Sequence, residues 1–169
     1  MHDTAMTAGQ QFLEQYAKSH MHIVEIGSQD INGGLRSHAP QGSTYTGLDH
    51  VAGPGVDFVL TDPYQFPLAP ACADIVIASS VLEHSELFWL TFLEMVRICR
   101  PGGYVYINAP SNGPIHRFPV DCWRFYPDSA QALIKWAKRS RYDLDLVSVR
   151  LVPPVADVWI DYCAVFRRR

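Results

Sequence analysis

Apolar and polar positions fall into blocks that predict strands and helices in turn. Short apolar runs predict strands at residues 22–26, 44–48, 56–60, 74–78, 104–109, 144–150 and 158–167. Apolar positions at helical spacing predict helices at residues 7–19, 35–38, 87–99 and 127–139. Most strands are therefore followed by a helix or a loop before the next strand. This alternation is typical of a parallel sheet with helices packed on its faces.

The fold class predicted by this order is α/β, as one doubly wound, Rossmann-like domain over residues 1–169. A length of 169 residues suits one domain with its own core. The last two strand patterns are separated by Pro153 and Pro154 and by no helical pattern. We therefore expect a mostly parallel, seven-stranded sheet with an antiparallel last strand and helices on both faces.

Composition narrows the classes of function. The net charge of −3 gives no electrostatic footprint for nucleic acid or an anionic membrane. No apolar run approaches the roughly 20 residues that a membrane span needs, and no secretory signal pattern is present. The four cysteines form no Cys-x-x-Cys pair. We expect a cytoplasmic protein with reduced thiols, no nucleic-acid partner and no membrane insertion.

The first predicted strand carries two features that point to a ligand. Glu25 lies inside the apolar run, where a carboxylate is costly to bury unless it has a partner. Gly27 follows and allows a tight turn with close backbone approach. Open α/β sheets bind ligands at the carboxyl ends of such strands. This stretch therefore predicts part of a site for a nucleoside-like cofactor. The alternative interpretation of Glu25 is a carboxylate that only caps nearby backbone amides.

Asp49 adds a second acid at the end of the next strand. It follows Gly27 by 22 residues, close to the spacing of about 20 that places an acid on a ribose. An ordinary turn aspartate is the alternative. The Gly-x-Gly-x-x-Gly pattern is absent after the first strand, which disfavours a nicotinamide-dependent oxidoreductase.

Five segments in register then resemble class I S-adenosylmethionine-dependent methyltransferases, in particular their small-molecule branch. They are residues 24–28, 45–49, 60–67, 73–84 and 97–103. The segment at 116–127, His-Arg-Phe-Pro-Val-Asp-Cys-Trp-Arg-Phe-Tyr-Pro, resembles a subgroup associated with bacterial glycan and surface-polysaccharide biosynthesis. The chain departs from the family at Gln29 and Ile31, where glycine is common.

The resemblance implies S-adenosyl-L-methionine as cofactor, bound at the carboxyl ends of the strands. The cofactor-binding residues that it implies are Glu25, Gly27, Ser28 and Gln29 at the amino-acid end, Asp49 at the ribose, His50 against the adenosine, Asp62 at the adenine amino group, and Ser79 and Ser80 beneath the sulfonium. Small side chains at the last two positions allow the backbone to approach the cofactor.

The acceptor half is expected around two histidines on the same sheet edge. Methyl transfer to oxygen needs alignment and a base, and His116 or His84 is the candidate. An aromatic and charged set beside His116 suits a sugar or a phosphorylated metabolite; its members are Arg117, Asp121, Trp123, Arg124 and Tyr126. The alternative is a self-satisfied cluster that only orders the loop. No metal site is predicted, because no clustered acids are visible.

Two hypotheses of different classes follow. The first is methyl transfer to an oxygen of a small molecule, a sugar or a glycan precursor. The second is a catalytically silent module of the same fold that binds the cofactor or a partner. A homodimer or a larger partner enzyme would be compatible with either hypothesis.

Overall fold

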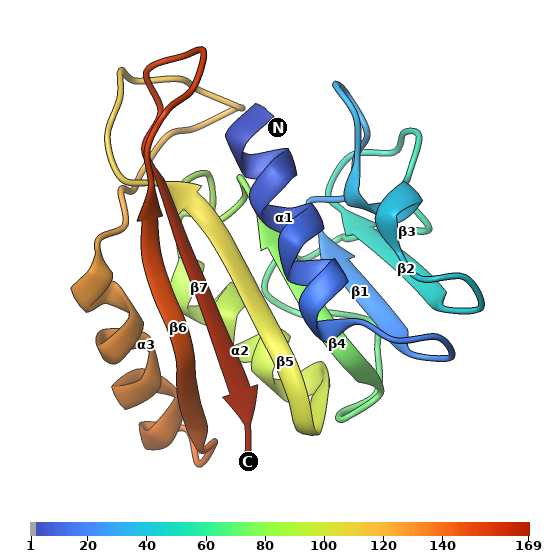
Figure 1. Ribbon diagram of the computed structural model, residues 1–169. Helices are drawn as coiled ribbons and strands as arrows, with labels where there is room; N and C mark the ends of the chain where they lie inside the picture. Colours follow the sequence, from blue (N-terminus) through green and yellow to red (C-terminus); the bar gives the residue numbers. More distant parts are fainter. Residues whose placement is uncertain (1–2) are drawn as a thin grey trace.

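Seven strands form one mixed sheet in the computed structural model, which describes residues 3–169 (Figure 1). The strands are β1 (His22–Ile26), β2 (Thr44–Asp49), β3 (Phe58–Val59), β4 (Ala73–Ser79), β5 (Cys99–Pro110), β6 (Leu144–Val152) and β7 (Asp161–Arg168). The helices are α1 (Asp3–Tyr16), the short 3-10 helix η1 (Leu35–His38), α2 (Phe88–Ile98) and α3 (Pro127–Arg139). The predicted α/β class is confirmed.

The strand order is β3-β2-β1-β4-β5-β7-β6, and the first five strands of this order are parallel. β7 is antiparallel to both β5 and β6. The predicted antiparallel last strand is therefore confirmed. It lies between β5 and β6, so that β6 forms the edge of the sheet.

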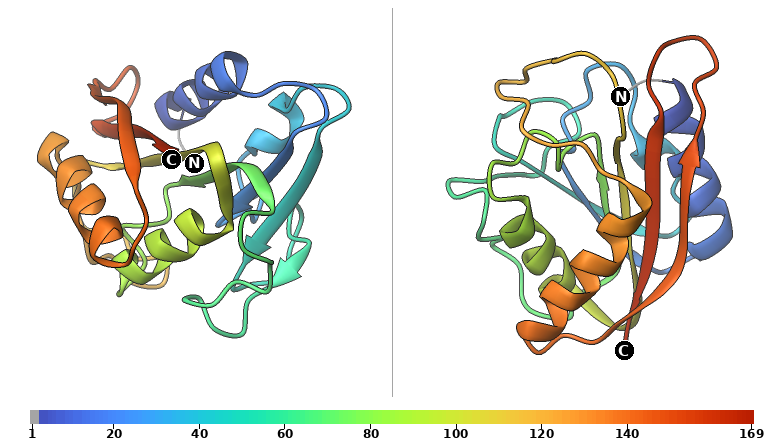
Figure 2. Two further views of the ribbon diagram at one scale, coloured as in Figure 1. Left: turned by 90° about the horizontal axis from the view of Figure 1, so that it is seen from below. Right: turned by 90° about the vertical axis from the view of Figure 1, so that its left-hand side faces the viewer.

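Two hydrophobic cores lie on opposite faces of this sheet, because successive side chains of a strand point to opposite sides. In β4, Ile75 and Ile77 pack with α1, whereas Val76 and Ala78 pack on the side of α2 and α3. Figure 2 shows α1 on one face and α2 with α3 on the other. Helices on both faces explain why β4 is apolar at consecutive positions.

Some element bounds differ from those predicted. The run at 56–60 forms only the two-residue strand β3, which pairs with Leu48 and Asp49 at the end of β2. Its two residues, Phe58 and Val59, are 44% and 52% exposed, as expected of a short edge strand. The predicted strand at 158–167 begins only at Asp161, since the preceding residues belong to the loop after β6.

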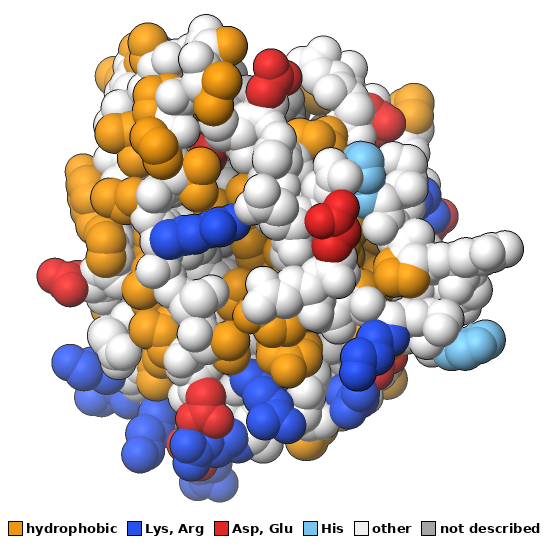
Figure 3. Space-filling model, viewed as in Figure 1, with side chains coloured by type: hydrophobic (Ala, Val, Ile, Leu, Met, Phe, Trp, Pro, Cys, Tyr) orange, Lys and Arg blue, Asp and Glu red, His pale blue; other side chains and the backbone are white. Residues whose placement is uncertain are grey.

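Two further properties bear on the class of protein. Among residues 3–169, no helix is long and apolar enough to cross a membrane. The four cysteines, Cys72, Cys99, Cys122 and Cys163, are free thiols. On the face drawn in Figure 3, most of the Lys and Arg side chains gather at the lower end, where β7 finishes, away from the edge at which β1 and β4 end.

Candidate functional site

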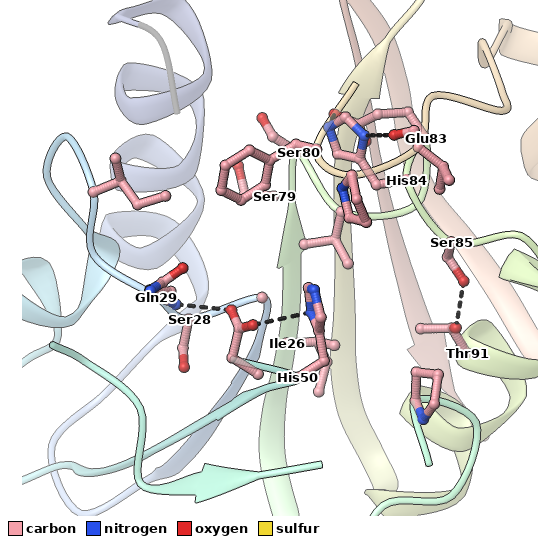
Figure 4. A pocket seen from close by; sticks show the side chains of 18 of the residues that line it. Ile26, Ser28, Gln29, His50, Ser79, Ser80, Glu83, His84, Ser85 and Thr91 are labelled. Carbon is pink, nitrogen blue, oxygen red and sulfur yellow. Dashed lines mark hydrogen bonds and ion pairs between the residues drawn. The ribbon is translucent and has the colours of Figure 1, made fainter. Parts of the chain in front are cut away.

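A cavity of about 840 Å³ opens at the carboxyl ends of β1, β2 and β4. Its volume falls within the roughly 300–1,000 Å³ of small-molecule sites. The turns after these three strands line one part of it, and the loop after β5 lines another. Figure 4 shows side chains from these separate segments converging on one space. The cavity therefore lies at the edge of the sheet where the sequence predicts a ligand site.

The turn after β1 is built around Gly27. Its φ of +71° lies in the left-handed region that favours glycine. A Cβ here would lie 2.2 Å from Cγ2 of Val81, so the turn packs directly against the segment after β4. The backbone amide of Gly27 donates to the carbonyl of Leu48 at 2.8 Å. Gly27 therefore ties the ends of β1, β2 and β4 together at the cavity.

Glu25 lines the cavity at its buried end, with only 4% of its surface exposed. The hydroxyl of Tyr45 donates to its Oε2 at 2.9 Å. Burial raises the pKa of Glu25 to about 7, even though the Tyr45 hydrogen bond and the positive charge of Arg36 oppose that rise. The carboxyl group can therefore change its charge near neutral pH. Tyr45 is the partner that the sequence argument required.

Asp49 connects the turns after β1 and β2. Its Oδ2 accepts from the backbone amide of Gln29 at 3.0 Å, and its Oδ1 accepts from that of Val51 at 3.1 Å. The ring of His50 places Nδ1 3.1 Å from the same Oδ1 and is half exposed. Both Asp49 and His50 line the cavity. The buried carboxylate can present its remaining lone pairs to hydroxyl groups of a ligand.

Three serines at the carboxyl ends of β1 and β4 line the cavity, namely Ser28, Ser79 and Ser80. The Oγ atoms of Ser28 and Ser79 are buried and have no hydrogen-bond partner within residues 3–169. Ser80 has a positive φ of 56°, a strained conformation for a residue with a Cβ. Its amide nonetheless donates to the carbonyl of Asn108 on β5 at 3.0 Å. Such strain and such orphaned hydroxyls are typical of ligand sites.

Asp62 lies beside the cavity but is not one of its lining residues. Its Oδ1 accepts from the backbone amide of Tyr64 at 2.9 Å and is exposed. Its neighbours Thr61, Pro63 and Tyr64 line the cavity, whereas Asp62 does not. The aspartate shapes the loop that borders the cavity.

The two candidate bases meet at the other end of the cavity. The ring centroids of His84 and His116 are 4.8 Å apart, edge to face. His84 Nδ1 lies 2.6 Å from the carbonyl of Val120, so this nitrogen carries the proton and donates it. Burial lowers the pKa of His84, which keeps the ring neutral near pH 7. Its Nε2 therefore retains a lone pair, 3.7 Å from Oε1 of Glu83 (Figure 4).

The loop after β5 is organised by an ion pair. Arg124 donates to both carboxylate oxygens of Asp121, at 2.6 and 2.9 Å, and also to the carbonyls of Asn112 and Pro114. These hydrogen bonds hold the pKa of Asp121 well below its usual range. Asp121 in turn accepts from the backbone amide of His116 at 2.7 Å. The pair positions His116 and leaves Arg117 on the cavity wall.

The remaining candidates in this loop lie outside the cavity lining. Trp123 donates its indole N–H to the carbonyl of Ser85 at 3.0 Å and packs against Phe88 and Trp89. Tyr126 immediately precedes α3 and is 56% exposed. The residues that the structure brings together at the cavity are therefore His84, His116 and Arg117.

Among the lining residues that were not sequence candidates, Glu83 and Trp159 lie next to the two histidines. Glu83 is 1% exposed and lines the cavity, and burial raises its pKa to about 8. Its polar neighbours His84, Ser85 and Glu86 give no sign in the sequence that this acid is buried. Trp159 lies in the loop between β6 and β7, and its ring centroid is 4.6 Å from that of His116. No local pattern marks Trp159, because this contact joins distant parts of the chain.

Known proteins are similar to more than half of this chain. Residues 10–107 match the family model described as a methyltransferase domain. An uncharacterized methyltransferase of Mycobacterium ulcerans is 39% identical over 98 residues, which cover 55% of this chain. The match covers 36% of that relative, so the chain spans about a third of its length.

Solved structures share the fold over nearly the whole chain. A 1,6-didemethyltoxoflavin-N1-methyltransferase of Burkholderia thailandensis, with its substrate and S-adenosylhomocysteine bound, matches with a TM-score of 0.73 at 16% identity, over 97% of this chain and 78% of that chain. A structure of a putative methyltransferase in complex with the Trm112 activator of Haloferax volcanii matches with a TM-score of 0.68 at 13% identity, over 98% and 90%. At these identities the likeness concerns the fold alone.

Proposed function

Because this chain belongs to the methyltransferase-domain family, whose enzymes use S-adenosyl-L-methionine, we propose that it transfers the donor's methyl group to an oxygen of a small molecule, a sugar or a glycan precursor. The observation that carries the proposal is that one cavity is lined by the predicted donor residues other than Asp62 and also by His84 and His116. Methyl transfer needs donor and acceptor in one water-poor space, aligned to within about 3–3.5 Å.

The donor is assigned to the end formed by the turns after β1 and β2. There Asp49 would accept hydrogen bonds from the ribose hydroxyls. Each hydrogen bond to a charged group contributes about 1.5–3 kcal/mol. Gly27 would let the backbone approach the amino-acid end, and Glu25 in its ionised form would attract the donor's ammonium group. The unpartnered hydroxyls of Ser28 and Ser79 are available to the same ligand.

The acceptor is assigned to the end formed by the loop after β5. In the transfer, an acceptor oxygen forms a bond to the methyl carbon while the carbon–sulfur bond breaks, and its electron pair stays on sulfur to give S-adenosylhomocysteine. The hydroxyl proton must leave. The lone pair on Nε2 of His84 supports this residue as the proton acceptor, and His116 is the second candidate.

A panel of hydroxylated acceptors tests this proposal. We would supply S-adenosylmethionine with free sugars, nucleotide sugars and phenols, and measure S-adenosylhomocysteine formed. Turnover should depend on acceptor and fall about 10²–10⁴-fold in the variant that removes the base, His84→Gln or His116→Gln. The matched control is His38→Gln, because His38 is exposed on η1, outside the cavity lining. Equal turnover in all three variants would refute a histidine base.

A catalytically silent partner module is the second candidate. The chain matches only about a third of its mycobacterial relative, and one solved protein of the same fold is in complex with a methyltransferase activator. Such a module would bind S-adenosylhomocysteine yet turn over no acceptor alone. It would gain activity, or confer it, only with a second protein, which size-exclusion chromatography of the mixture would reveal.

The setting of the reaction is also part of the proposal. The likeness of residues 116–127 to a glycan-related subgroup supports a glycan precursor as acceptor. The four free thiols support a reducing, cytoplasmic location. The net charge of −3 supports a small-molecule partner over nucleic acid.

A further inference from the structure

Three side chains at the acceptor end of the cavity form a cluster of possible metal ligands. Glu83, His84 and His116 each offer one ligand atom, and these atoms lie within 4.8 Å of one another. Glu83 and His84 are consecutive residues in the segment after β4, and His116 lies in the loop after β5. The sequence predicts no metal site, because no clustered acids are visible in it, and the third ligand here comes from a distant part of the chain.

His84 has the arrangement that metal-bound histidines commonly show. Its Nδ1 donates to a backbone carbonyl, that of Val120, at 2.6 Å. This hydrogen bond fixes the tautomer and leaves Nε2 unprotonated, on the side of the ring that faces Glu83. Nε2 lies 3.7 Å from Oε1 of Glu83, which is too long for a hydrogen bond and leaves room for a shared cation.

Glu83 supplies an independent indication that a cationic ligand belongs here. Its side chain is 1% exposed, and its Oε2 has no hydrogen-bond partner among residues 3–169. A carboxyl group buried in this way is costly unless it is paired or coordinates a metal. Because Glu83 borders the cavity, a bound cation would reach it from there.

His116 is positioned by its loop, and its side chain is only partly buried. Asp121 accepts from its backbone amide at 2.7 Å and lies 3.3 Å from its Nδ1. The side chain is 38% exposed on the cavity side of the loop. Metal bonds to nitrogen and oxygen are about 2.0–2.2 Å long, so the three ligand atoms must approach one another by roughly an ångström. A rotation of the His116 ring is the smallest change that would achieve this.

We propose that Glu83, His84 and His116 bind one divalent transition-metal cation of the zinc class, with its open coordination positions facing the cavity. Two imidazoles and one carboxylate suit Zn²⁺ and related first-row cations, whereas Mg²⁺ and Ca²⁺ prefer sites made of oxygen alone. Three protein ligands leave at least one position for a ligand oxygen, as in catalytic zinc sites.

The consequence for the acceptor rests on the proposed function. A hydroxyl group coordinated to the cation loses its proton to solvent more readily, and the resulting oxygen attacks the methyl carbon. With the cation bound, the histidines act as its ligands, and the metal-coordinated hydroxyl takes the place of the histidine base in the proposed function. Acceptors whose hydroxyl can coordinate a metal, such as vicinal diols, are favoured by this arrangement.

Cobalt(II) titration tests the metal site without reference to methyl transfer. Tag-free protein is stripped with a chelator and titrated with Co²⁺, and visible absorption and calorimetry are recorded. We expect one Co²⁺ per chain, displaced by Zn²⁺. His116→Gln and Glu83→Gln should weaken binding by at least about 10–100-fold, because the first removes an imidazole ligand and the second removes the negative charge of the carboxylate. His38→Gln, an exposed histidine on η1, is the matched control and should bind as the wild type does.

The outcomes separate the two proposals. Circular dichroism verifies that each variant is folded, and calorimetry with S-adenosylhomocysteine reports the donor end. No Co²⁺ or Zn²⁺ binding by folded wild-type protein, or unchanged binding in His116→Gln, would overturn the metal site. Donor binding would then leave the proposed function standing. Metal binding without donor binding would uphold the site and remove the proposed function.

Discussion

The hydroxyl of Tyr45 on β2 donates to Oε2 of Glu25 on β1 at 2.9 Å, inside the sheet edge that borders the cavity. The two strands are parallel neighbours, which brings the side chains together on the α1 face. The hydrogen bond reduces the free-energy cost of burying the Glu25 carboxylate, but it does not replace all of the solvation that the carboxylate loses. Glu25 is thus held with a pKa of about 7 beside the proposed donor site.

This shift makes stability depend on pH. The folded-state pKa of about 7 exceeds the ordinary glutamate pKa of 4.5, so the folded state binds more protons between these pH values and loses stability as the pH rises. Relative to Glu25→Gln, which stays neutral, the wild type should lose about 2–3 kcal/mol of unfolding free energy between pH 5 and pH 8. Urea unfolding of both proteins at the two pH values measures this. A pH-independent difference would show that Glu25 titrates as an exposed acid does.

Gly27 should tolerate no side chain. Gly27→Ala would require a positive φ from alanine and would place its Cβ 2.2 Å from Val81. We expect a loss of about 2–4 kcal/mol in unfolding free energy. Gly34→Ala is the matched control. Its φ is −139° and the nearest atoms to an added Cβ are 3.7 Å away, so stability should stay equal or rise by up to about 1 kcal/mol. Equal losses in both variants would contradict this account of the turn.

Arg124 should govern the order of the loop after β5. Arg124→Lys keeps the charge but loses the planar fork that donates to Asp121 and to three carbonyl groups. We expect faster amide hydrogen exchange over residues 111–125 and a loss of about 1–3 kcal/mol, with donor binding unchanged. Arg117→Lys, on an exposed neighbouring residue, serves as control and should leave exchange unaltered. Unchanged exchange in Arg124→Lys would mean that the ion pair does not organise the loop.

The fold could be predicted largely because buried parallel strands have a distinctive pattern. The apolar run around Ile75 and Val76 requires cover on both faces, and α1 and α2 provide it. The prediction of strand length was wrong at the edge strand β3. Phe58 and Val59 look like part of a longer strand, yet pairing with β2 is available at two positions only. Edge pairing depends on the neighbouring strand, which local sequence does not encode.

The candidate site was predictable where it depends on strand ends. Asp49 and Gly27 follow consecutive strands, and parallel strands bring such residues to one edge. Contacts between distant loops were less accessible. That His84 and His116 lie on one edge could be inferred, but their 4.8 Å approach to each other and the part played by Trp159 depend on the path of the loop after β5. Asp62 and Trp123 were also candidates for the site, but neither side chain lines the cavity.

The backbone amide of Gln29 should contribute more to donor binding than its side chain does. Its amide donates to Asp49 at 3.0 Å, while its side chain reaches only the carbonyl of Ala52, at 3.4 Å. Gln29→Gly keeps the amide and should bind S-adenosylhomocysteine within about threefold of wild type, because the lost side-chain hydrogen bond is worth at most about 0.5 kcal/mol at this length. A large loss of affinity, measured by calorimetry, would assign the side chain a direct part in donor binding.

The measurement that tests the central claim most directly is a calorimetric titration of S-adenosylhomocysteine into wild-type protein and Asp49→Ala. Asp49 bridges the turns after β1 and β2 and lines the cavity. We expect micromolar binding at one site per chain in the wild type and no measurable binding in Asp49→Ala, with both proteins folded by circular dichroism. No binding by folded wild type, or equal binding by Asp49→Ala, would contradict the assignment of this cavity to the methyl donor.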